Sequence, residues 1–392
     1  MKKTLLAAAL MAGFAGIAQA ETSVTLYGVV DGGIGYHQTK FSENRSTTAL
    51  QQGTASSFKN NRTGLIDGVQ LGNRWGLRGT EDLGNGLRAV FVLESGFSLG
   101  TGHQAQGGRL FGRQATLGLA GDSWGQLDLG RQTNIASKYL GEASPFGYGF
   151  DQANLGAAMS AANTVRYDNM VMYQTPNFSG FQFGVGYSFR VNGNQAGSDT
   201  INGAKVKTDN PGVTAGLRYN NGPIGAGLTY DQFKDRQGVT SNGGTGSVTA
   251  KAWGAAFSYD FDVVKLHLGG GQTRDGMFAQ TLPNTNSSAL RVFNDFEGTK
   301  GSRINSYIAG LSAPVGEGKV MASWQMADLS KLPTAYRNSD LRKKKEQTYS
   351  LGYVHPLSKR TDVYAIGSYA KNAYFVDSQK TTLLGVGLTH RF

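Results

Sequence analysis

The chain of 392 residues contains no cysteine, and this absence excludes several kinds of protein. A disulfide scaffold, a thiol nucleophile and a cysteine-ligated metal site all require that residue. The absence also fits export into an oxidising compartment, where a free thiol is a liability. The five histidines stand apart without metal-ligand spacing, so we expect no metal and no cofactor.

After the first 20 residues, no segment reaches the roughly 18 consecutive apolar residues that a membrane-spanning helix requires. Together with a mean hydropathy of −0.32, this would ordinarily indicate a soluble protein. Yet the chain has only 8 prolines beside 57 glycines, 17 tyrosines and 20 phenylalanines. In a membrane β-barrel only alternate residues face lipid, so mean hydropathy stays low. The composition therefore favours an all-β membrane barrel.

The first 20 residues have the pattern of a secretory signal peptide. Lys2 and Lys3 give a charged start, residues 5–17 are apolar, and the segment ends on a small-x-small site at 18–20. We therefore expect the protein to be exported, residues 1–20 to be removed, and residues 21–392 to form one domain.

Apolar and small or polar side chains alternate along the rest of the chain. In 253–261, for example, Trp253 and Phe257 alternate with Gly254 and Ser258. Because successive side chains of a strand point to opposite faces, this periodicity predicts strands. A tilted strand of about ten residues spans roughly 23 Å, which matches the apolar band of an outer-membrane barrel. We predict sixteen strands, at 22–36, 70–79, 86–97, 109–120, 125–131, 165–175, 181–190, 211–220, 223–232, 249–260, 263–273, 303–313, 317–327, 346–356, 361–371 and 382–392.

The connections between these strands alternate in length. Short turns such as 221–222 and 261–262 alternate with long segments. This sorting is typical of a barrel with short periplasmic turns and long outer loops, whereas a soluble sandwich has no reason for it. The long loops are expected at 37–69, 98–108, 132–164, 191–210, 233–248, 274–302, 328–345 and 372–381.

The last predicted strand runs to the final residue. Chain ends usually fray, so a strand at the terminus suggests that this end is structurally committed. We predict that 382–392 pairs with 22–36 and closes the barrel, because every backbone group in lipid must be paired. The residues of this closure and assembly signal are Leu384, Val386, Leu388, His390 and Phe392.

The faces opposite the aromatic ones should line a lumen that has more bases than acids. The formal net charge is +11, and basic residues are spread along the chain, which disfavours a nucleic-acid site. Inside a pore such charges would act on permeating anions; alternatively, neighbours such as Arg166 and Asp168 neutralise each other. The predicted lumen charges include Arg74, Arg78, Arg88, Arg166, Arg218, Asp31, Glu94 and Asp168.

The third long loop, 132–164, is rich in glycine, alanine and aromatic residues and has few charges. One reading is that it folds into the lumen, where Glu142 and Asp151 face the arginines across a narrow gap. Opposed charges would then create a transverse field that orients polar solutes. The other reading is an ordinary surface loop.

Several longer stretches resemble a known family. SVTLYGVVDGGI, NRWGLRGTEDLGNGLRAVFVLE, FGRQATLGLAGDSWGQLDLGRQ, RYDNMVMYQTPNFSGFQFGVGY, SLGYVHPLSKRTDVYAIGSYAK and the closing GVGLTHRF are similar to the general porins of Gram-negative outer membranes, β-proteobacterial branch. The resemblance covers the mature chain. It implies a homotrimer of 16-stranded barrels in the outer membrane, in contact with lipid, lipopolysaccharide and the barrel-assembly machinery.

The resemblance also implies a constriction formed by the inward third loop and a wall of arginines. Arg74, Arg113 and Arg166 match family arginines by motif. Alternation, however, places Arg113 on the face of Leu117 and Leu119, so the sequence leaves the direction of this side chain open. Glu142 and Asp151 match only by position.

We therefore expect a passive, water-filled channel for small ions and hydrophilic solutes, with a preference for anions. The alternatives are a substrate-specific anion channel and a non-conducting adhesin or structural barrel. An enzyme is disfavoured because His267, the inward histidine in mid-strand, has no evident catalytic partner.

Overall fold

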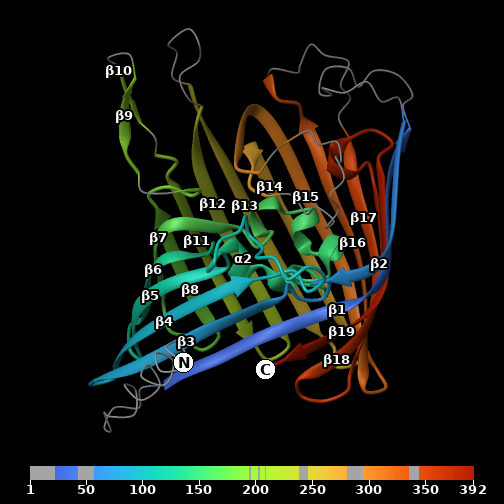
Figure 1. Ribbon diagram of the computed structural model, residues 1–392, viewed down its shortest axis with the longest axis horizontal. Helices are drawn as coiled ribbons and strands as arrows, with labels where there is room; N and C mark the ends of the chain where they lie inside the picture. The colour runs from blue at the N-terminus through green and yellow to red at the C-terminus, as the bar shows by residue number, and fades with distance from the viewer. Residues whose placement is uncertain are drawn as a thin grey trace, which may run out of the picture.

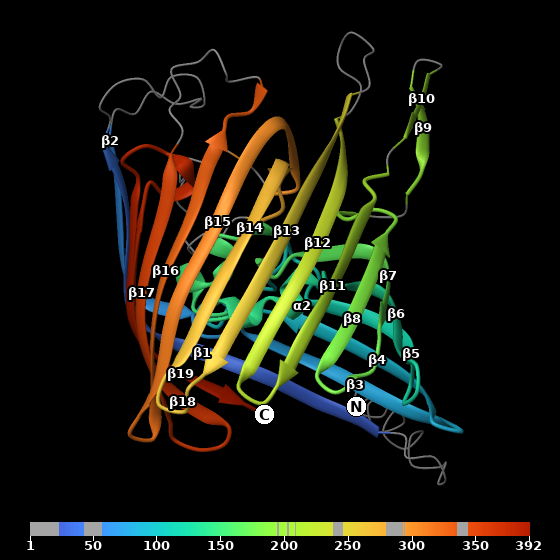
Figure 2. The ribbon, with the colours of Figure 1, turned by 180° about the vertical axis from the view of Figure 1, so that it is seen from behind.

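A computed structural model describes residues 23–42, 57–193, 196–201, 204–207, 209–237, 246–279, 293, 295–334 and 344–392. The predicted signal peptide, 1–20, lies outside these residues. The described chain forms a closed 16-stranded antiparallel barrel with long connections at one end and tight turns at the other (Figures 1 and 2).

The strands follow the predicted order closely, and most predicted bounds differ from the observed ones by a few residues. The barrel strands are β1 (Ser23–Ser42), β2 (Ser57–Asp67), β3 (Arg74–Gly84), β4 (Leu87–Gly96), β5 (Gln114–Gly121), β6 (Gly125–Thr133), β7 (Arg166–Gln174), β8 (Phe181–Ser188), β11 (Gly212–Asn221), β12 (Ile224–Gln237), β13 (Gly246–Asp260), β14 (Lys265–Met277), β15 (Glu297–Val315), β16 (Gly318–Lys331), β17 (Lys345–Pro356), β18 (Thr361–Lys371) and β19 (Lys380–Arg391). A separate hairpin, β9 (Ser198–Ile201) and β10 (Ala204–Lys207), lies in the fourth long connection.

These seventeen strands occupy sixteen positions around the barrel, because β2 and β3 pair with different parts of β1 and together act as one strand. The lower part of β1 pairs with β3, and its upper part pairs with β2. The segment 68–73, which is not in a strand, separates β2 from β3. The expectation that 37–69 is a loop is therefore wrong in part, since both of its ends continue the sheet.

The barrel closes where the alternation at the chain end predicts. β19 pairs antiparallel with β1, from Val29 opposite Arg391 to Lys40 opposite Lys380. The main-chain N–H groups of Gly28 and Phe392 each donate to the carbonyl of the other residue, at 3.1 Å. The prediction that the final strand shuts the barrel is confirmed.

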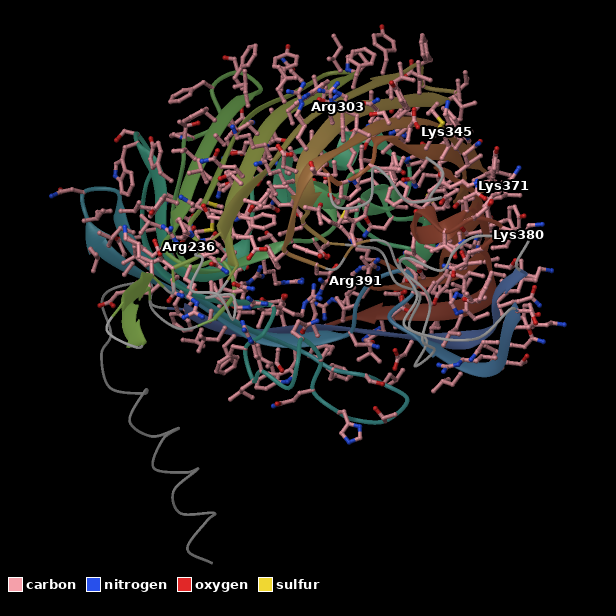
Figure 3. All side chains as sticks on the ribbon, turned by 90° about the horizontal axis from the view of Figure 1, so that it is seen from above. Arg236, Arg303, Lys345, Lys371, Lys380 and Arg391 are labelled. Carbon is pink, nitrogen blue, oxygen red and sulfur yellow. The ribbon has the colours of Figure 1, made fainter. Side chains whose placement is uncertain are left out.

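The two faces of the wall also follow the predicted alternation. Large apolar side chains are exposed on the outer face; Trp253 is 51% exposed and Val386 is 59% exposed. From above, Lys371 and Lys380 extend away from the barrel, whereas Arg391 lies on the lumen side (Figure 3). An outer band of apolar residues around a closed sheet is the arrangement that lipid requires.

The third long connection folds into the barrel interior (Figures 1 and 2). It contains α2 (Ala136–Tyr139) and four single-turn 3₁₀ helices, at Gly141–Ala143, Asp151–Ala153, Leu155–Ala157 and Ser160–Ala162. Among the described residues, none of the helices is long and apolar enough to cross a membrane. Of the two readings of this segment, the inward one is correct.

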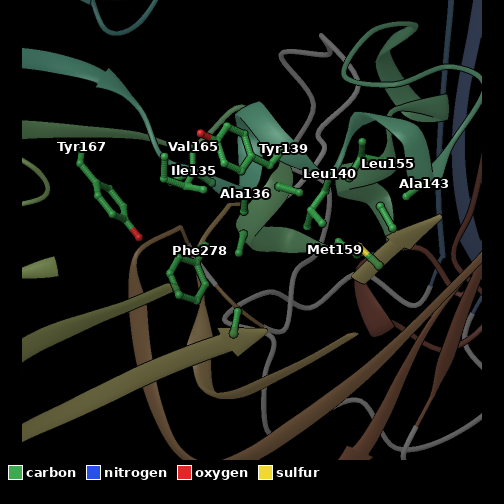
Figure 4. Close-up of a cluster of buried hydrophobic side chains, with 14 of the residues drawn as sticks. Ile135, Ala136, Tyr139, Leu140, Ala143, Leu155, Met159, Val165, Tyr167 and Phe278 are labelled. Atoms are coloured by element: carbon green, nitrogen blue, oxygen red, sulfur yellow. The ribbon is translucent and has the colours of Figure 1, made fainter. Parts of the chain in front are cut away.

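A buried apolar cluster fixes this loop to the wall (Figure 4). Ile135, Leu140 and Leu155 are almost fully buried in a cluster that includes Phe233 of β12 and Phe278, directly after β14. Burying such a side chain contributes about 1.5–3 kcal/mol, so the loop is held by its own apolar residues as well as by hydrogen bonds.

Tyr167 belongs to the same cluster, although alternation predicts that it faces lipid with Val171 and Tyr173. It is 0% exposed, and its ring lies 6.1 Å from that of Phe296. One extra residue in β7 opposite β6 changes the register here, and Asn169 has a φ of 49°. This β-bulge turns Tyr167 inward, so the expected outward direction is wrong.

Candidate pore constriction

A cluster of arginines lies on the wall formed by β3, β4, β5 and β7. Arg74 begins β3, Arg166 begins β7, and Arg113 directly precedes β5. The Arg74 guanidinium interacts electrostatically with Arg113 and Glu94. The structure thus brings the three arginines of the family motifs together; we refer to Arg74, Arg113, Arg166 and Glu94 as the basic cluster.

Only one carboxylate lies within this cluster. Arg113 Nε donates to Glu94 Oε1 at 2.7 Å, and Tyr27 donates its hydroxyl to Glu94 Oε2 at 3.0 Å. Arg166 donates instead to main-chain carbonyls, those of Arg113 and Thr164, at 3.0 and 3.2 Å. A carbonyl holds a guanidinium in place without cancelling its charge, so among the described residues no carboxylate neutralises Arg166 through an ion pair.

Arg113 points inward, contrary to its sequence parity. It lies outside β5, which begins at Gln114, so strand alternation does not apply to it. Its main-chain N–H donates to the Glu94 carbonyl at 3.2 Å, and its side chain is 13% exposed. The direction of Arg113, which the sequence leaves open, is therefore inward.

A second group of charges surrounds Asp168. Arg109 Nη1 lies 2.9 Å from Asp168 Oδ1, and Arg131 also donates to this carboxylate. The main-chain N–H of Gly193 donates to Asp168 Oδ2 at 2.7 Å. Asp168 is thus paired with these two arginines and not with Arg166, which overturns the suggested Arg166–Asp168 neutralisation.

The remaining predicted basic residues occupy other levels of the lumen. The Arg78 guanidinium lies 5.4 Å from the centroid of the Tyr27 ring. Arg78 is four residues from Arg74 along β3. Arg88 forms an ion pair of 2.8 Å with Asp122 in the turn between β5 and β6. Arg218 lies 4.9 Å from the centroid of Tyr139 in the third loop. All three therefore have partners of their own and lie outside the basic cluster.

Asp31 faces inward as predicted, but it does not contribute a free charge to the lumen. It is 0% exposed and accepts hydrogen bonds from the main chain of Val69 and Leu71 and from the hydroxyls of Tyr364 and Thr389. These bonds join β1 to β18, to β19 and to the segment 68–73 between β2 and β3. Asp31 is therefore a structural residue of barrel closure.

Glu142 does not face the arginines, which corrects the expected transverse pair. Its carboxylate accepts from Lys265 and Ser258 on the opposite wall, each at 2.8 Å. Burial opposes its ionisation, but the hydrogen bonds from Lys265 and Ser258 hold the pKa of Glu142 below its usual range. His267 lies 3.0 Å from the Glu142 main-chain carbonyl and 3.1 Å from Ser312 Oγ. Glu142 and His267 anchor the loop to β13, β14 and β15.

Asp151 lies further along the loop, where the chain approaches β17 and β18. The preceding residue, Phe150, donates its N–H to the Gln70 carbonyl at 3.3 Å. Among the described ion pairs none includes Asp151, and burial raises the pKa of its carboxyl to about 7. Near neutral pH this residue is therefore only partly ionised.

Comparisons with known proteins identify this architecture. The family model described as Gram-negative porin matches residues 7–373. An outer membrane porin protein of Bordetella pertussis is 53% identical over 404 aligned positions that cover 100% of both chains. The chain belongs to the Gram-negative porin family. Its location is accordingly the outer membrane.

Two further relatives extend the comparison. The porin is 33% identical to outer membrane porin protein 32 of Delftia acidovorans, over 95% of this chain and 90% of that protein. The solved structure of an anion-selective porin from Comamonas acidovorans matches with a TM-score of 0.66 at 28% identity, over 95% of the porin and 100% of that chain. Family and fold point to a channel and not to an enzyme.

Sequence reasoning placed Glu94 on an inward face but did not connect it with the arginines. It also omitted Arg109 and Arg131, because both stand outside regular alternation. Arg109 precedes β5, and Arg131 lies at the register change between β6 and β7. The signal that was available is their place in the long stretch FGRQATLGLAGDSWGQLDLGRQ and its flank.

The electrostatics of the porin's lumen follow from these partners. In the basic cluster, three guanidinium groups against one carboxylate leave a net charge of +2. Two acids outside the cluster are already engaged: Asp168 by two arginines and Glu142 by Lys265. Among the described residues, no three His, Asp or Glu side chains gather as a metal site would require. The arrangement can attract and guide anions through a narrow, water-filled passage.

Proposed function

We propose that this porin is a general diffusion channel for small hydrophilic solutes and ions, with a preference for anions that arises at the basic cluster. The observation that supports the proposal is the net charge of this cluster at the height of the inward third loop. Arg74 and Arg166 form no ion pair with a carboxylate among the described residues. A lumen with an uncompensated positive field concentrates anions and repels cations.

The roles of individual residues follow from the same geometry. Arg74, Arg113 and Arg166 form the basic wall of the constriction, and Glu94 limits its charge. The third loop supplies the opposing edge through its backbone and apolar surface, while Glu142 fixes it to the far wall. The similarity to an anion-selective porin agrees with this assignment.

The test is the reversal potential of the refolded porin in a planar bilayer under a KCl gradient. We expect a potential of the sign for chloride preference. Arg74→Ala and Arg166→Ala should each reduce it, because each removes one uncompensated positive charge. Arg88→Ala is the matched control: it removes an arginine that is already paired with Asp122 at the periplasmic end, and the potential should hardly change.

Cation preference in the unchanged porin would contradict the proposal. A substrate-specific anion channel remains the second candidate, and saturation of the current by one anion at low concentration would favour it. The absence of conductance steps would favour an adhesin or structural barrel.

We also propose that the porin functions as a homotrimer embedded in outer-membrane lipid and lipopolysaccharide, and that the barrel-assembly machinery inserts it. The closed barrel with its exposed apolar band supports the lipid contact, and the family supports the trimer. Native mass spectrometry of the refolded porin in detergent tests the trimer directly; a monomer as the sole species would contradict it.

A further inference from the structure

A pocket of about 570 Å³ lies beneath the third loop, on the opposite side of the barrel from the basic cluster. Its roof is the loop segment 141–147, and its wall is formed by the lower ends of β13, β14, β15 and β16. The tight turns of these strands lie at the lower end of the barrel, with the third loop above them (Figure 2). A volume of this size is typical of sites that bind small molecules.

The lining of this pocket contains charges of both signs. Lys265 is paired with Glu142 at 2.8 Å, which leaves one ammonium and two carboxylates of the lining, those of Lys319, Asp260 and Asp262. Among the described ion pairs, none includes any of these three residues. All three are exposed, so their charges are accessible to a solute in the lumen.

The ammonium and the carboxylates lie at opposite sides of the pocket. Asp260 of β13 stands directly opposite Lys265 of β14, whereas Lys319 of β16 stands opposite Pro314 of β15. Neighbouring strands are about 4.8 Å apart, so about 15 Å separates the backbones of β13 and β16. The side chain of Lys319 shortens this gap, because its ammonium is close enough to His267 of β14 to interact with it electrostatically.

The surface between the two charged sides is apolar. A Cβ at Gly310 of β15 would come within 2.5 Å of the Pro145 ring, so Pro145 of the third loop lies over the strand between the two sides. Phe146 and Pro314 also line the pocket. An apolar surface between opposed charges fits a zwitterion with an apolar body. An extended tripeptide spans about 10 Å, which matches the gap better than a single amino acid does.

We propose that this pocket binds short zwitterionic peptides of two or three residues. The terminal carboxylate of the peptide binds the Lys319 ammonium, its terminal ammonium binds Asp260 and Asp262, and its side chains contact Pro145. An inorganic anion lacks the positive end and is therefore not the preferred ligand. The inference goes beyond anion preference and rests on the proposed function only because the peptide reaches the pocket through the lumen.

The experiment is saturation-transfer NMR of the full, refolded porin in detergent, titrated with trialanine. Lys319→Gln should raise the dissociation constant by about threefold or more, and so should Asp260→Asn with Asp262→Asn, because each change removes one charged side. The matched controls are Lys359→Gln and Glu317→Gln, which change a lysine and an acid in neighbouring turns outside the pocket lining. Both controls should leave the dissociation constant unchanged.

Two capped peptides test which end binds where. Trialanine amide lacks the carboxylate and N-acetyltrialanine lacks the ammonium, so both should bind the unchanged porin about threefold or more weakly than trialanine. Lys319→Gln should not weaken the amide further, and the double Asn variant should not weaken the acetylated peptide further. Equal binding of capped and uncapped peptides, or unchanged binding of trialanine in both pocket variants, would overturn the site.

The binding measurement is separate from the test of the channel, because it needs neither a membrane nor a potential. Chloride preference without trialanine binding would overturn the peptide site and leave the proposed channel standing. Trialanine binding with the expected variant effects, in a porin that prefers cations, would support the site and contradict the proposed anion preference. Conductance steps of each variant in a planar bilayer show that its barrel is folded.

Discussion

Arg113 and Arg166 carry the same formal charge on the same wall and differ in what their guanidinium groups contact. Arg113 is paired with Glu94, whereas Arg166 is held by carbonyls. The field in the lumen depends on this difference, because a paired charge adds little at a distance. We therefore expect Arg166 to act more strongly than Arg113 on a permeating ion.

Asp31 illustrates a charge whose role is structural. Replacing Asp31 with Ala removes the acceptor of four hydrogen bonds and leaves buried donors unsatisfied, each at a cost of about 1–3 kcal/mol. We predict a loss of unfolding free energy of about 3 kcal/mol or more, measured by urea unfolding of the porin in detergent. Asp31→Asn, which keeps one acceptor oxygen, should lose less; equal stability of the Ala variant would contradict this role.

Asp151 leads us to predict a pH dependence of the porin near neutrality. Burial raises the pKa of its carboxyl to about 7, so the residue is neutral below this pH and negative above it. A new negative charge in the lumen opposes anion attraction, so chloride preference should fall as pH rises from 6 to 8. The reversal potential measured over this range checks it. Asp151→Asn should remove this pH step; a step that persists in the variant would assign it to another group.

At the scale of an element, the third loop is fixed to the barrel at both ends and along its length. Near its start, Asn134 donates to Asp231 Oδ1 at 2.7 Å, and the Ile135 N–H donates to Thr214 Oγ1 at 2.8 Å. On the return path, Ser306 donates to the Ala158 carbonyl. The apolar cluster fills the space between these points, so the loop has one well-defined position in the lumen.

Gly227 on β12 allows the loop to lie close to the wall. A Cβ at this position would come within 2.5 Å of the Tyr139 carbonyl oxygen. We predict that Gly227→Val displaces the loop toward the pore axis, at a cost of about 1–3 kcal/mol, and lowers single-channel conductance. Gly270→Val is the matched control, since its Cβ would meet nothing closer than 3.7 Å. Equal conductance in both variants would show that the loop does not set the pore width.

The strands and the closure could be predicted from sequence because both depend on local alternation. Trp253 and Phe257 face lipid as their spacing predicts. Alternation failed at Tyr167, where a bulge changes the register, and at Arg113, which lies outside a strand. The direction of Glu142 could not be predicted, because it depends on Lys265, 123 positions further along the chain. Long-range partners of loop residues leave no periodic signal.

On the scale of the whole molecule, the barrel separates two chemically different surfaces. Inside, the basic cluster lies on the lumen wall; outside, large apolar side chains such as Trp253 and Val386 are exposed. A closed sheet keeps the two surfaces apart, because neighbouring residues of one strand face opposite sides. One chain can thus present positive charge to the lumen and an apolar surface to lipid.

The central claim is that unpaired positive charge at the constriction selects anions, and charge replacement at one lumen position tests it most directly. The porin has no cysteine, so Arg74→Cys can be labelled without background. The measurement is the reversal potential of this variant under a KCl gradient, before and after labelling with a positive and, separately, a negative methanethiosulfonate. We predict that the variant loses part of its chloride preference, that the positive label restores it, and that the negative label lowers it further. A reversal potential that stays unchanged with both labels, while labelling is complete by mass, would contradict the account.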